Sequence, residues 1–305
     1  MGYRAGMRVL VTGGSGFVGR EIVRQLVPAG HGVRVLSRHG GRKGDGVEYF
    51  AGSLFDNPSV VAAAAGCTAV IHLVGIIGEI GGQTFERVHV EGTQRILEAA
   101  RTAGIRRFIH MSAMGARADA PARYHRTKWA AEEAVRGSGL DATIFRPSLI
   151  YGPGDGVVSL FETLGSWSPV VPVIGSGGGR LQPVAVLDVG HCFVRALTLP
   201  RTIGLTYELG GPDVVSFNQL LKAILLRRGR RRWIVHVPLP LARIIVWCLE
   251  GMFPLLLRRA PPLNRDQILM LGEDNVGDSS AAWREFNHHP VALSDGLNAL
   301  PGTGG

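Results

Sequence analysis

The feature that most constrains this chain is a glycine-rich turn between an apolar segment and an amphipathic one, close to the N-terminus. Residues 7–12 form an apolar, β-branched run that predicts a buried strand, and residues 20–27 carry apolar side chains at helical spacing. Gly13 permits a tight turn, Gly16 lets the backbone approach a pyrophosphate, and Gly19 lets the helix pack on the strand. Because free N–H groups and a partial positive charge stand at a helix N-terminus, this turn predicts a dinucleotide site.

Strand and helix patterns alternate through the first half of the chain. The expected strands cover residues 33–36, 47–50, 69–74, 107–111 and 142–145, and the expected helices cover 56–64, 84–103 and 124–135. Such alternation predicts parallel βαβ units in a Rossmann-type, doubly wound α/β sheet, with a binding crevice at the carboxyl ends of the strands.

Two domains are expected from this pattern. Residues 1–155 would form an NAD(P)-binding Rossmann domain, and residues 156–305 a smaller, mostly helical C-terminal lobe on the substrate side. Segments within about 181–210 are expected to return to the first domain, with strands at residues 181–186 and 205–209.

The charge balance and the cysteines limit the partners. Thirty-three Lys and Arg against 24 Asp and Glu give a net charge of +9, which suits a phosphorylated cofactor or an anionic membrane surface. No nucleic-acid motif accompanies this charge, so we expect no nucleic-acid partner. Three widely spaced cysteines predict neither a disulfide nor a metal site. With no apolar signal core before Met7, a reducing, cytoplasmic location is expected.

The residues after the second expected strand bear on the choice of cofactor. Folds that select NAD usually place an acidic residue there, on the ribose 2′-hydroxyl, whereas this chain has Ser37 and Arg38, followed by Arg42 and Lys43. A guanidinium beside a hydroxyl suits a 2′-phosphate, because it offers several fixed donors. The pattern favours NADP(H), with NAD(H) as the alternative cofactor and a basic surface turn as the plain interpretation.

Tyr124 and Lys128 stand four residues apart, on one face of an expected helix. Beside a nicotinamide, the lysine charge is expected to lower a tyrosine pKa that is ordinarily about 10. The lysine can also bind the nicotinamide ribose, while the tyrosine acts as general acid or base during hydride transfer. The pair is therefore the candidate catalytic pair. The plain interpretation is a solvated helix face.

Together these motifs resemble an atypical, extended-type short-chain dehydrogenase/reductase of the NAD-dependent epimerase/dehydratase kind. Segments 52–56, 70–75, 88–93 and 145–152 add to the glycine turn and the Tyr124/Lys128 pair. More narrowly, the chain is similar to bacterial relatives of the nucleotide-binding accessory subunit of respiratory complex I, through segments 72–77, 83–93, 110–115, 207–212, 238–242 and 266–275.

The resemblance implies a set of cofactor contacts that follow the ends of successive strands. They are Gly13, Ser15, Gly16, Phe17, Val18, Gly19, Ser37, Arg38, Ser53, Leu54, Leu73, Val74, Gly75, His89, Met111, Tyr124, Lys128 and Pro147.

Three positions depart from the pattern of the family. Met114 is expected in the slot of the catalytic hydroxyl, and Ser112 lies two residues early, as a substitute or as a plain strand-end hydroxyl. His89 stands where asparagine is common, as its partial replacement or as a structural histidine, and Ser53 stands where aspartate often contacts adenine. The missing hydroxyl predicts little turnover.

The C-terminal third contains a cluster of arginines within residues 227–232, followed by Trp233 and a strongly apolar stretch at 239–257. Prolines and charges interrupt this stretch, so no transmembrane span is expected. A basic cluster beside tryptophan-containing amphipathic segments is typical of docking on an anionic membrane or a membrane complex. The plain interpretation is an exposed turn followed by core helices.

Three functions are consistent with these patterns. The first is an NADP(H)-holding protein linked to complex I or to a quinone pathway, with little or no turnover, peripheral on the inner face of the cytoplasmic membrane. The second is an active NADPH-dependent oxidoreductase that acts on a lipophilic substrate through Tyr124 and Lys128. The third is a sugar-nucleotide epimerase or dehydratase, for which Arg180 is the candidate contact to an anionic substrate group.

Overall fold

A seven-stranded parallel sheet forms the centre of the computed structural model, which describes residues 6–38, 40–41, 44, 46–257 and 263–301, with side chains except at 254–257. Its strands are β1 (Arg8–Thr12), β2 (Gly32–Ser37), β3 (Val47–Ala51), β4 (Ala69–His72), β5 (Arg107–Met111), β6 (Asp141–Pro147) and β11 (Thr206–Leu209). They lie in the order β11-β6-β5-β4-β1-β2-β3, and every neighbouring pair is parallel. The predicted doubly wound α/β fold is confirmed, and its winding reverses at β1, where such sheets bind ligands.

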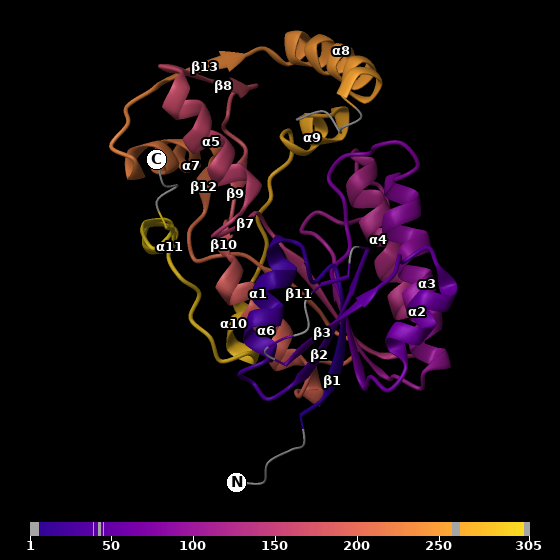
Figure 1. Ribbon diagram of the computed structural model, residues 1–305. Helices are drawn as coiled ribbons and strands as arrows, with labels where there is room; N and C mark the ends of the chain where they lie inside the picture. The colour runs from indigo at the N-terminus through magenta and orange to yellow at the C-terminus, as the bar shows by residue number, and fades with distance from the viewer. Residues whose placement is uncertain (1–5, 39, 42–43, 45, 258–262, 302–305) are drawn as a thin grey trace.

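Helices cover both faces of the sheet (Figure 1). One layer contains α1 (Phe17–Leu26), α6 (Val186–Ala196) and α10 (Ser280–Glu285), and the other contains α2 (Asn57–Ala64), α3 (Gly92–Thr102) and α4 (Arg123–Arg136). Val9 and Val11 pack into the first layer and Leu10 into the second, all fully buried. Burial on both faces explains why this strand is an unbroken apolar run in the sequence.

The structure differs from the sequence-based prediction at two places in this domain. The helix expected at residues 84–103 begins as a π-helical segment, η1 (Glu86–Glu91), and continues as α3. The strand expected at 181–186 does not join the central sheet. Instead β9 (Arg180–Leu181) pairs with β12 (Val215–Ser216), and β10 (Val184–Ala185) pairs with β7 (Ile150–Tyr151). Pro183 separates the two short strands, because it has no N–H for a ladder.

A second group of elements forms a lobe over the carboxyl edge of the sheet (Figure 1). It comprises α5 (Gly156–Trp167), β8 (Val170–Ile174), α7 (Phe217–Arg227), β13 (Trp233–Val237), α8 (Leu239–Leu257), α9 (Arg265–Met270) and α11 (Leu293–Asn298). A short 3-10 turn, η2 (Pro200–Thr202), precedes β11. A capping box between Ser216 and Gln219 begins α7. The chain after residue 212 is mostly helical, as expected, and its two strands in the described ranges are β12, which pairs with β9, and β13, which pairs with β8.

Three arginines of the cluster at residues 227–232 bind other residues of this lobe. Arg227 and Arg228 both pair with the buried carboxylate of Glu162 on α5, and Arg232 donates through Nε to the Gly165 carbonyl at 2.8 Å. The expectation that residues 227–232 form one surface-facing basic cluster is therefore wrong for these three arginines, because a buried carboxylate and a helix-end carbonyl need their donors.

Candidate dinucleotide-binding site

The glycine turn has the backbone shape that a pyrophosphate needs. Gly13 has a φ of +79°, a conformation that favours glycine, and its carbonyl accepts the Gly16 N–H at 3.0 Å. A Cβ on Gly19 would lie 2.2 Å from the Gly13 oxygen, so only glycine allows α1 to approach this closely. At Gly16 the corresponding distance is 3.3 Å. Because no side chain caps α1, its first N–H groups face the turn and fit a dinucleotide phosphate.

The other expected contact residues stand at the same edge of the sheet, directly at or after strand ends. Ser37 ends β2, Ser53 and Leu54 follow β3, Leu73, Val74 and Gly75 follow β4, Met111 ends β5, and Pro147 ends β6. Parallel strands bring these positions together along one crevice.

The side chains at this edge differ in where they lie. Val18 and Leu54 are buried in the two cores, and the Ser53 hydroxyl accepts the Phe55 N–H at 3.2 Å. Ser15 and Arg38 are exposed. Arg42 and Lys43, expected near the 2′-phosphate, lie outside the described residues.

Lys128 lies on α4 and is buried, with 3% of its surface exposed. Its ammonium donates to the Met111 carbonyl, at the end of β5, over 2.6 Å. A Cβ on Gly75 would lie 3.7 Å from Nζ, so the amine also borders the segment after β4. Burial lowers the pKa of Lys128 to about 8, against the opposing effect of Glu132. This lysine therefore changes charge close to physiological pH.

Tyr124 is half-buried and contacts three aromatic rings. The centroids of Phe85, His89 and His125 lie 5.9, 5.4 and 5.3 Å from the tyrosine ring, and all three are edge-on. Burial raises the pKa of Tyr124 to about 12. The expectation that Lys128 lowers this pKa is wrong for the structure, because desolvation dominates and the lysine is directed at a carbonyl. The phenol is neutral at neutral pH.

The hydroxyl positions of the family pattern are altered in the structure as well. Ser112 is buried, and its Oγ has no hydrogen-bond partner among the described residues. The Met114 side chain lies against the backbone at Gly277, where a Cβ would be 3.2 Å from its Cε. Arg180 is exposed and paired with Asp274, which accepts from its Nε at 2.8 Å and from its terminal nitrogen at 2.6 Å.

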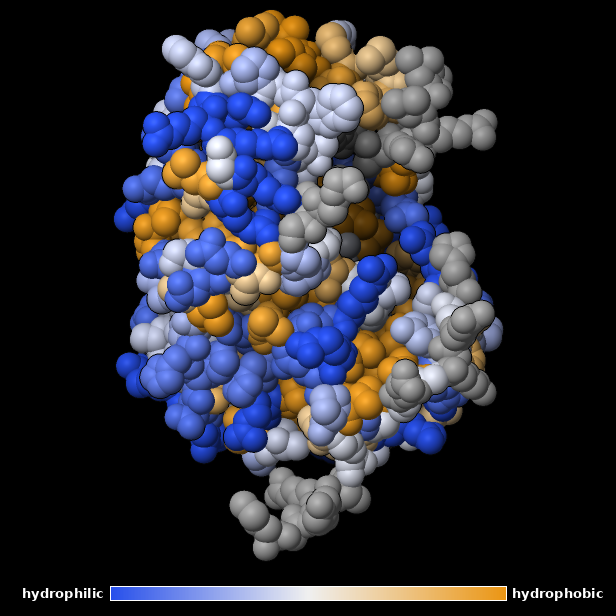
Figure 2. Space-filling model, turned by 60° about the vertical axis from the view of Figure 1, so that its left-hand side comes forward, coloured by the Kyte–Doolittle hydropathy of each residue, from blue (hydrophilic) through white to orange (hydrophobic). Residues whose placement is uncertain are grey.

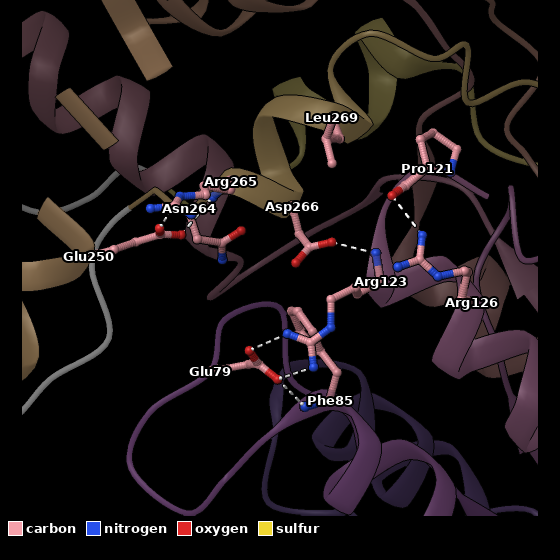
Figure 3. Close-up of a pocket in the computed structure, with 10 residues that line it drawn as sticks. All are labelled: Glu79, Phe85, Pro121, Arg123, Arg126, Glu250, Asn264, Arg265, Asp266 and Leu269. Carbon is pink, nitrogen blue, oxygen red and sulfur yellow. Dashed lines mark hydrogen bonds and ion pairs between the residues drawn. The ribbon is translucent and has the colours of Figure 1, made fainter. Parts of the chain in front are cut away.

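A cavity of about 530 Å³ borders this site (Figure 3). It is lined by Glu79, Phe85, Pro121, Arg123, Arg126, Glu250, Asn264, Arg265, Asp266 and Leu269. Phe85, which lines the cavity, also contacts the ring of Tyr124. Asp266 accepts the Arg123 N–H at 2.5 Å, and the Asn264 amide donates to the Ile77 carbonyl at 2.7 Å. Segment 264–266 therefore holds both the start of α4 and the segment after β4.

Sequence reasoning missed these cavity residues. They come from the segment before η1, the start of α4, and helices α8 and α9, which only the fold brings together. The one local signal was the capping box between Asn264 and Gln267, which marks the start of α9. Arg20 was also missed, although its Nε donates to the Ser15 carbonyl beside the glycine turn at 2.9 Å.

Comparisons with known proteins agree with this geometry. A family of NAD(P)H-binding proteins matches residues 13–163. The mitochondrial NADH dehydrogenase [ubiquinone] 1 alpha subcomplex subunit 9 of Arabidopsis thaliana is 32% identical over 306 residues, which cover 95% of this chain and 76% of that protein. Ceramide reductase of Caulobacter vibrioides is 33% identical over 241 residues, which cover 76% of this chain and 74% of that protein.

Solved structures show the same fold. UDP-glucose 4-epimerase of Thermotoga maritima, with UDP-glucose, superposes with a TM-score of 0.73 at 21% identity and covers 96% of both chains. The dTDP-glucose 4,6-dehydratase of Streptomyces venezuelae, a double mutant with NAD bound, has a TM-score of 0.74 at 22% identity, covering 96% of this chain and 95% of that one.

The chain belongs to the NAD(P)-binding, epimerase/dehydratase-like short-chain dehydrogenase/reductases, as its motifs predicted, and its relatives include the complex I subunit and ceramide reductase. Its cofactor is a nicotinamide dinucleotide. Within the described ranges, no helix combines the length and apolar character that a membrane crossing needs. Nor do the described His, Cys, Asp and Glu side chains gather in a group of three that could hold a metal ion.

The charge of Lys128 should make dinucleotide affinity depend on pH. We expect affinity to fall as pH rises through about 8, because deprotonation removes charge-assisted hydrogen bonds worth about 1.5–3 kcal/mol each. Lys128→Met should bind more weakly at pH 7 and lose this dependence, whereas Lys222→Met, on the exposed side of α7, should behave as wild type. Calorimetric titration from pH 7 to 9 measures both effects, and a flat wild-type profile would contradict the assignment.

Proposed function

We propose that this protein holds NADP(H) with little turnover while docked on an anionic membrane or a membrane-bound respiratory complex. The observation that carries the proposal is the contrast between the phosphate-binding glycine turn and the catalytic region around Tyr124. The glycine turn is complete, whereas Tyr124 has a pKa of about 12 and Met114 stands where the family pattern has a hydroxyl. A site of this kind binds a dinucleotide better than it moves protons. The similarity to a subunit of a respiratory enzyme supports the same proposal.

The preference for NADP(H) rests on the end of β2. Ser37 ends this strand and Arg38 follows it, exposed at the edge of the crevice. An acidic side chain here would favour the free 2′-hydroxyl of NAD, whereas a guanidinium favours a 2′-phosphate.

Charge reversal at Arg38 tests this preference. Arg38→Asp should weaken NADPH binding by about tenfold or more, the equivalent of one charge-assisted hydrogen bond, and leave NADH binding nearly unchanged. Arg284→Asp makes the same charge change on α10, away from the crevice, and is the matched control. Calorimetry with both cofactors distinguishes the two variants. Equal losses for NADPH and NADH would refute the role of Arg38.

The docking proposal rests on exposed apolar side chains at the end of α5, on β13 and on α8, which we call the outer apolar face. The hydrophobic atoms at the top of the molecule in Figure 2 lie at its α8 end. The outer apolar face consists of Trp167, Trp233, Val235, Leu241, Ile244, Ile245, Trp247 and Met252, with Arg231 and Arg243 among them. The three tryptophans are 88%, 78% and 63% exposed, in chain order. On α8 only Ala242 and Val246 are fully buried among the described side chains, so this helix turns its apolar side outward.

This outer apolar face has the composition of a surface that lies in a membrane interface. Tryptophan is enriched at the level of lipid head groups, and an apolar helix face can rest in the interface without crossing the bilayer. Each exposed arginine near an anionic surface adds about 1 kcal/mol that salt screens. Because Arg227, Arg228 and Arg232 are bound inside the lobe, Arg231 and Arg243 are the cations that we assign to lipid.

Flotation with vesicles of phosphatidylserine and phosphatidylcholine tests the docking face. Arg231→Gln with Arg243→Gln should remove the salt-sensitive part of binding, and Ile244→Ser with Trp247→Ser should remove the salt-resistant part. Ile203→Ser, an exposed apolar residue on the central domain, is the control and should bind as wild type. The proposal fails if the wild-type protein stays unbound by these vesicles and by native membranes at low salt.

A second candidate function is reduction of a lipophilic substrate, and the cavity beside Tyr124 favours it. Phe85 both lines this cavity and touches the tyrosine ring, so the cavity lies one aromatic ring away from the phenol. The similarity to ceramide reductase supports this alternative. Sugar-nucleotide chemistry is less well supported, since the guanidinium of Arg180, the candidate contact to an anionic substrate group, already pairs with Asp274.

Turnover distinguishes the two candidates. Under the holding proposal, we expect the purified protein to retain bound NADPH and not oxidise it in the presence of long-chain ketones, and Tyr124→Phe to leave this behaviour unchanged. Absorbance at the nicotinamide band measures it. NADPH oxidation that Tyr124→Phe abolishes would replace the holding function by the reductase function.

A further inference from the structure

His89 connects three parts of the site: the π-helical segment η1, helix α4 and the segment after β4. It lies in the π-helical segment η1 and is 1% exposed. Its Nδ1 is 2.9 Å from the hydroxyl of Thr127 on α4, and its Nε2 is 3.1 Å from the Ile76 N–H, after β4. The imidazole therefore bridges helix α4 and the segment after β4.

Both ring nitrogens of His89 have polar neighbours. Nδ1 lies 2.9 Å from the Thr127 hydroxyl, which itself lies 3.0 Å from the carbonyls of Arg123 and Tyr124. Nε2 lies 3.1 Å from both the N–H and the carbonyl oxygen of Ile76. In either tautomer one ring nitrogen donates and the other accepts, so the imidazole bridges α4 and the segment after β4.

The ring faces of His89 are also occupied. Phe85 stacks on it with centroids 5.6 Å apart, and Tyr124 meets it edge-on at 84°. A Cβ on Gly75 would lie 3.5 Å from Nε2 and 3.7 Å from the Lys128 amine, so the segment after β4 passes between these two nitrogens. A shift of the imidazole would move this segment relative to both Tyr124 and Lys128.

Acid–base catalysis by His89 itself is excluded by its surroundings. Burial and the nearby Lys128 charge hold its pKa at about 2, so it stays neutral through the physiological range. A neutral imidazole whose nitrogens are both hydrogen-bonded orients its neighbours and does not take up a proton at neutral pH.

We infer that His89 is a positioning residue that locks the segment at residues 75–77 to helix α4, and so fixes the nicotinamide half of the crevice. The inference rests on the proposed dinucleotide binding. His89 is given no role in binding the adenosine half of the dinucleotide, because in folds of this kind that half binds along β2 and β3, on the other side of β1. His89 is therefore expected to control one half of the cofactor selectively.

The test compares the whole dinucleotide with its adenosine half in four proteins: wild type, His89→Leu, His89→Asn and Thr127→Val. Calorimetry measures affinity for NADPH and for 2′,5′-ADP. His89→Leu should weaken NADPH binding by about tenfold, the equivalent of one hydrogen bond, and leave 2′,5′-ADP binding unchanged. His89→Asn should recover part of the loss, since an amide also donates and accepts.

Thr127→Val removes the hydroxyl that contacts Nδ1, together with its bond to the Arg123 or Tyr124 carbonyl, and keeps the volume of the side chain. It therefore provides the readout if His89→Leu does not fold. It should show the same selective loss. A fifth protein that combines Thr127→Val with His89→Leu should show no further loss, because the two residues act as one bridge. Unchanged NADPH affinity in both variants, or an equal loss of NADPH and 2′,5′-ADP, overturns the role of His89. Failure of the wild-type protein to bind either ligand overturns the proposed function itself.

Discussion

The rest of the structure depends on the contact between Gly19 and the carbonyl of Gly13. With no side chain at Gly19, α1 packs on β1 closely enough to direct its first N–H groups at the turn. That approach also sets how α1 meets α6, and α6 carries the chain from the lobe to the last strand of the sheet. A methyl group at Gly19 would push helix α1 away from the glycine turn that we assign to the pyrophosphate.

The local parts of the site could be predicted from the sequence. The glycine turn, the alternation of strands and helices, and the Tyr124/Lys128 spacing each lie within one element and its neighbour, where periodicity and backbone chemistry determine the result. Topology then brings every strand end to one edge, so the expected contact residues share a crevice without any long-range information.

The remaining features depend on burial and on distant pairing, which the sequence does not express. The phenol of Tyr124 has a raised pKa because the aromatic rings around it, two of them far away in the chain, partly desolvate it. Arg227 and Arg228 look like a surface cluster until Glu162, some 65 residues earlier, is seen to accept both. The strand expected at 181–186 is divided because Pro183 cannot donate to a ladder.

The bond from Asp266 to the Arg123 N–H has a consequence for how the chain matures. Helix α4 carries both Tyr124 and Lys128, yet a residue 143 positions later supplies the side-chain acceptor at its beginning. A nascent chain that has emerged only as far as β6 already contains the glycine turn and the tyrosine, but the first turn of α4 still lacks this acceptor. The order of synthesis therefore separates the two halves of the crevice in time: the residues of the glycine turn emerge first, and the start of α4 gains its side-chain acceptor only after Asp266 has emerged.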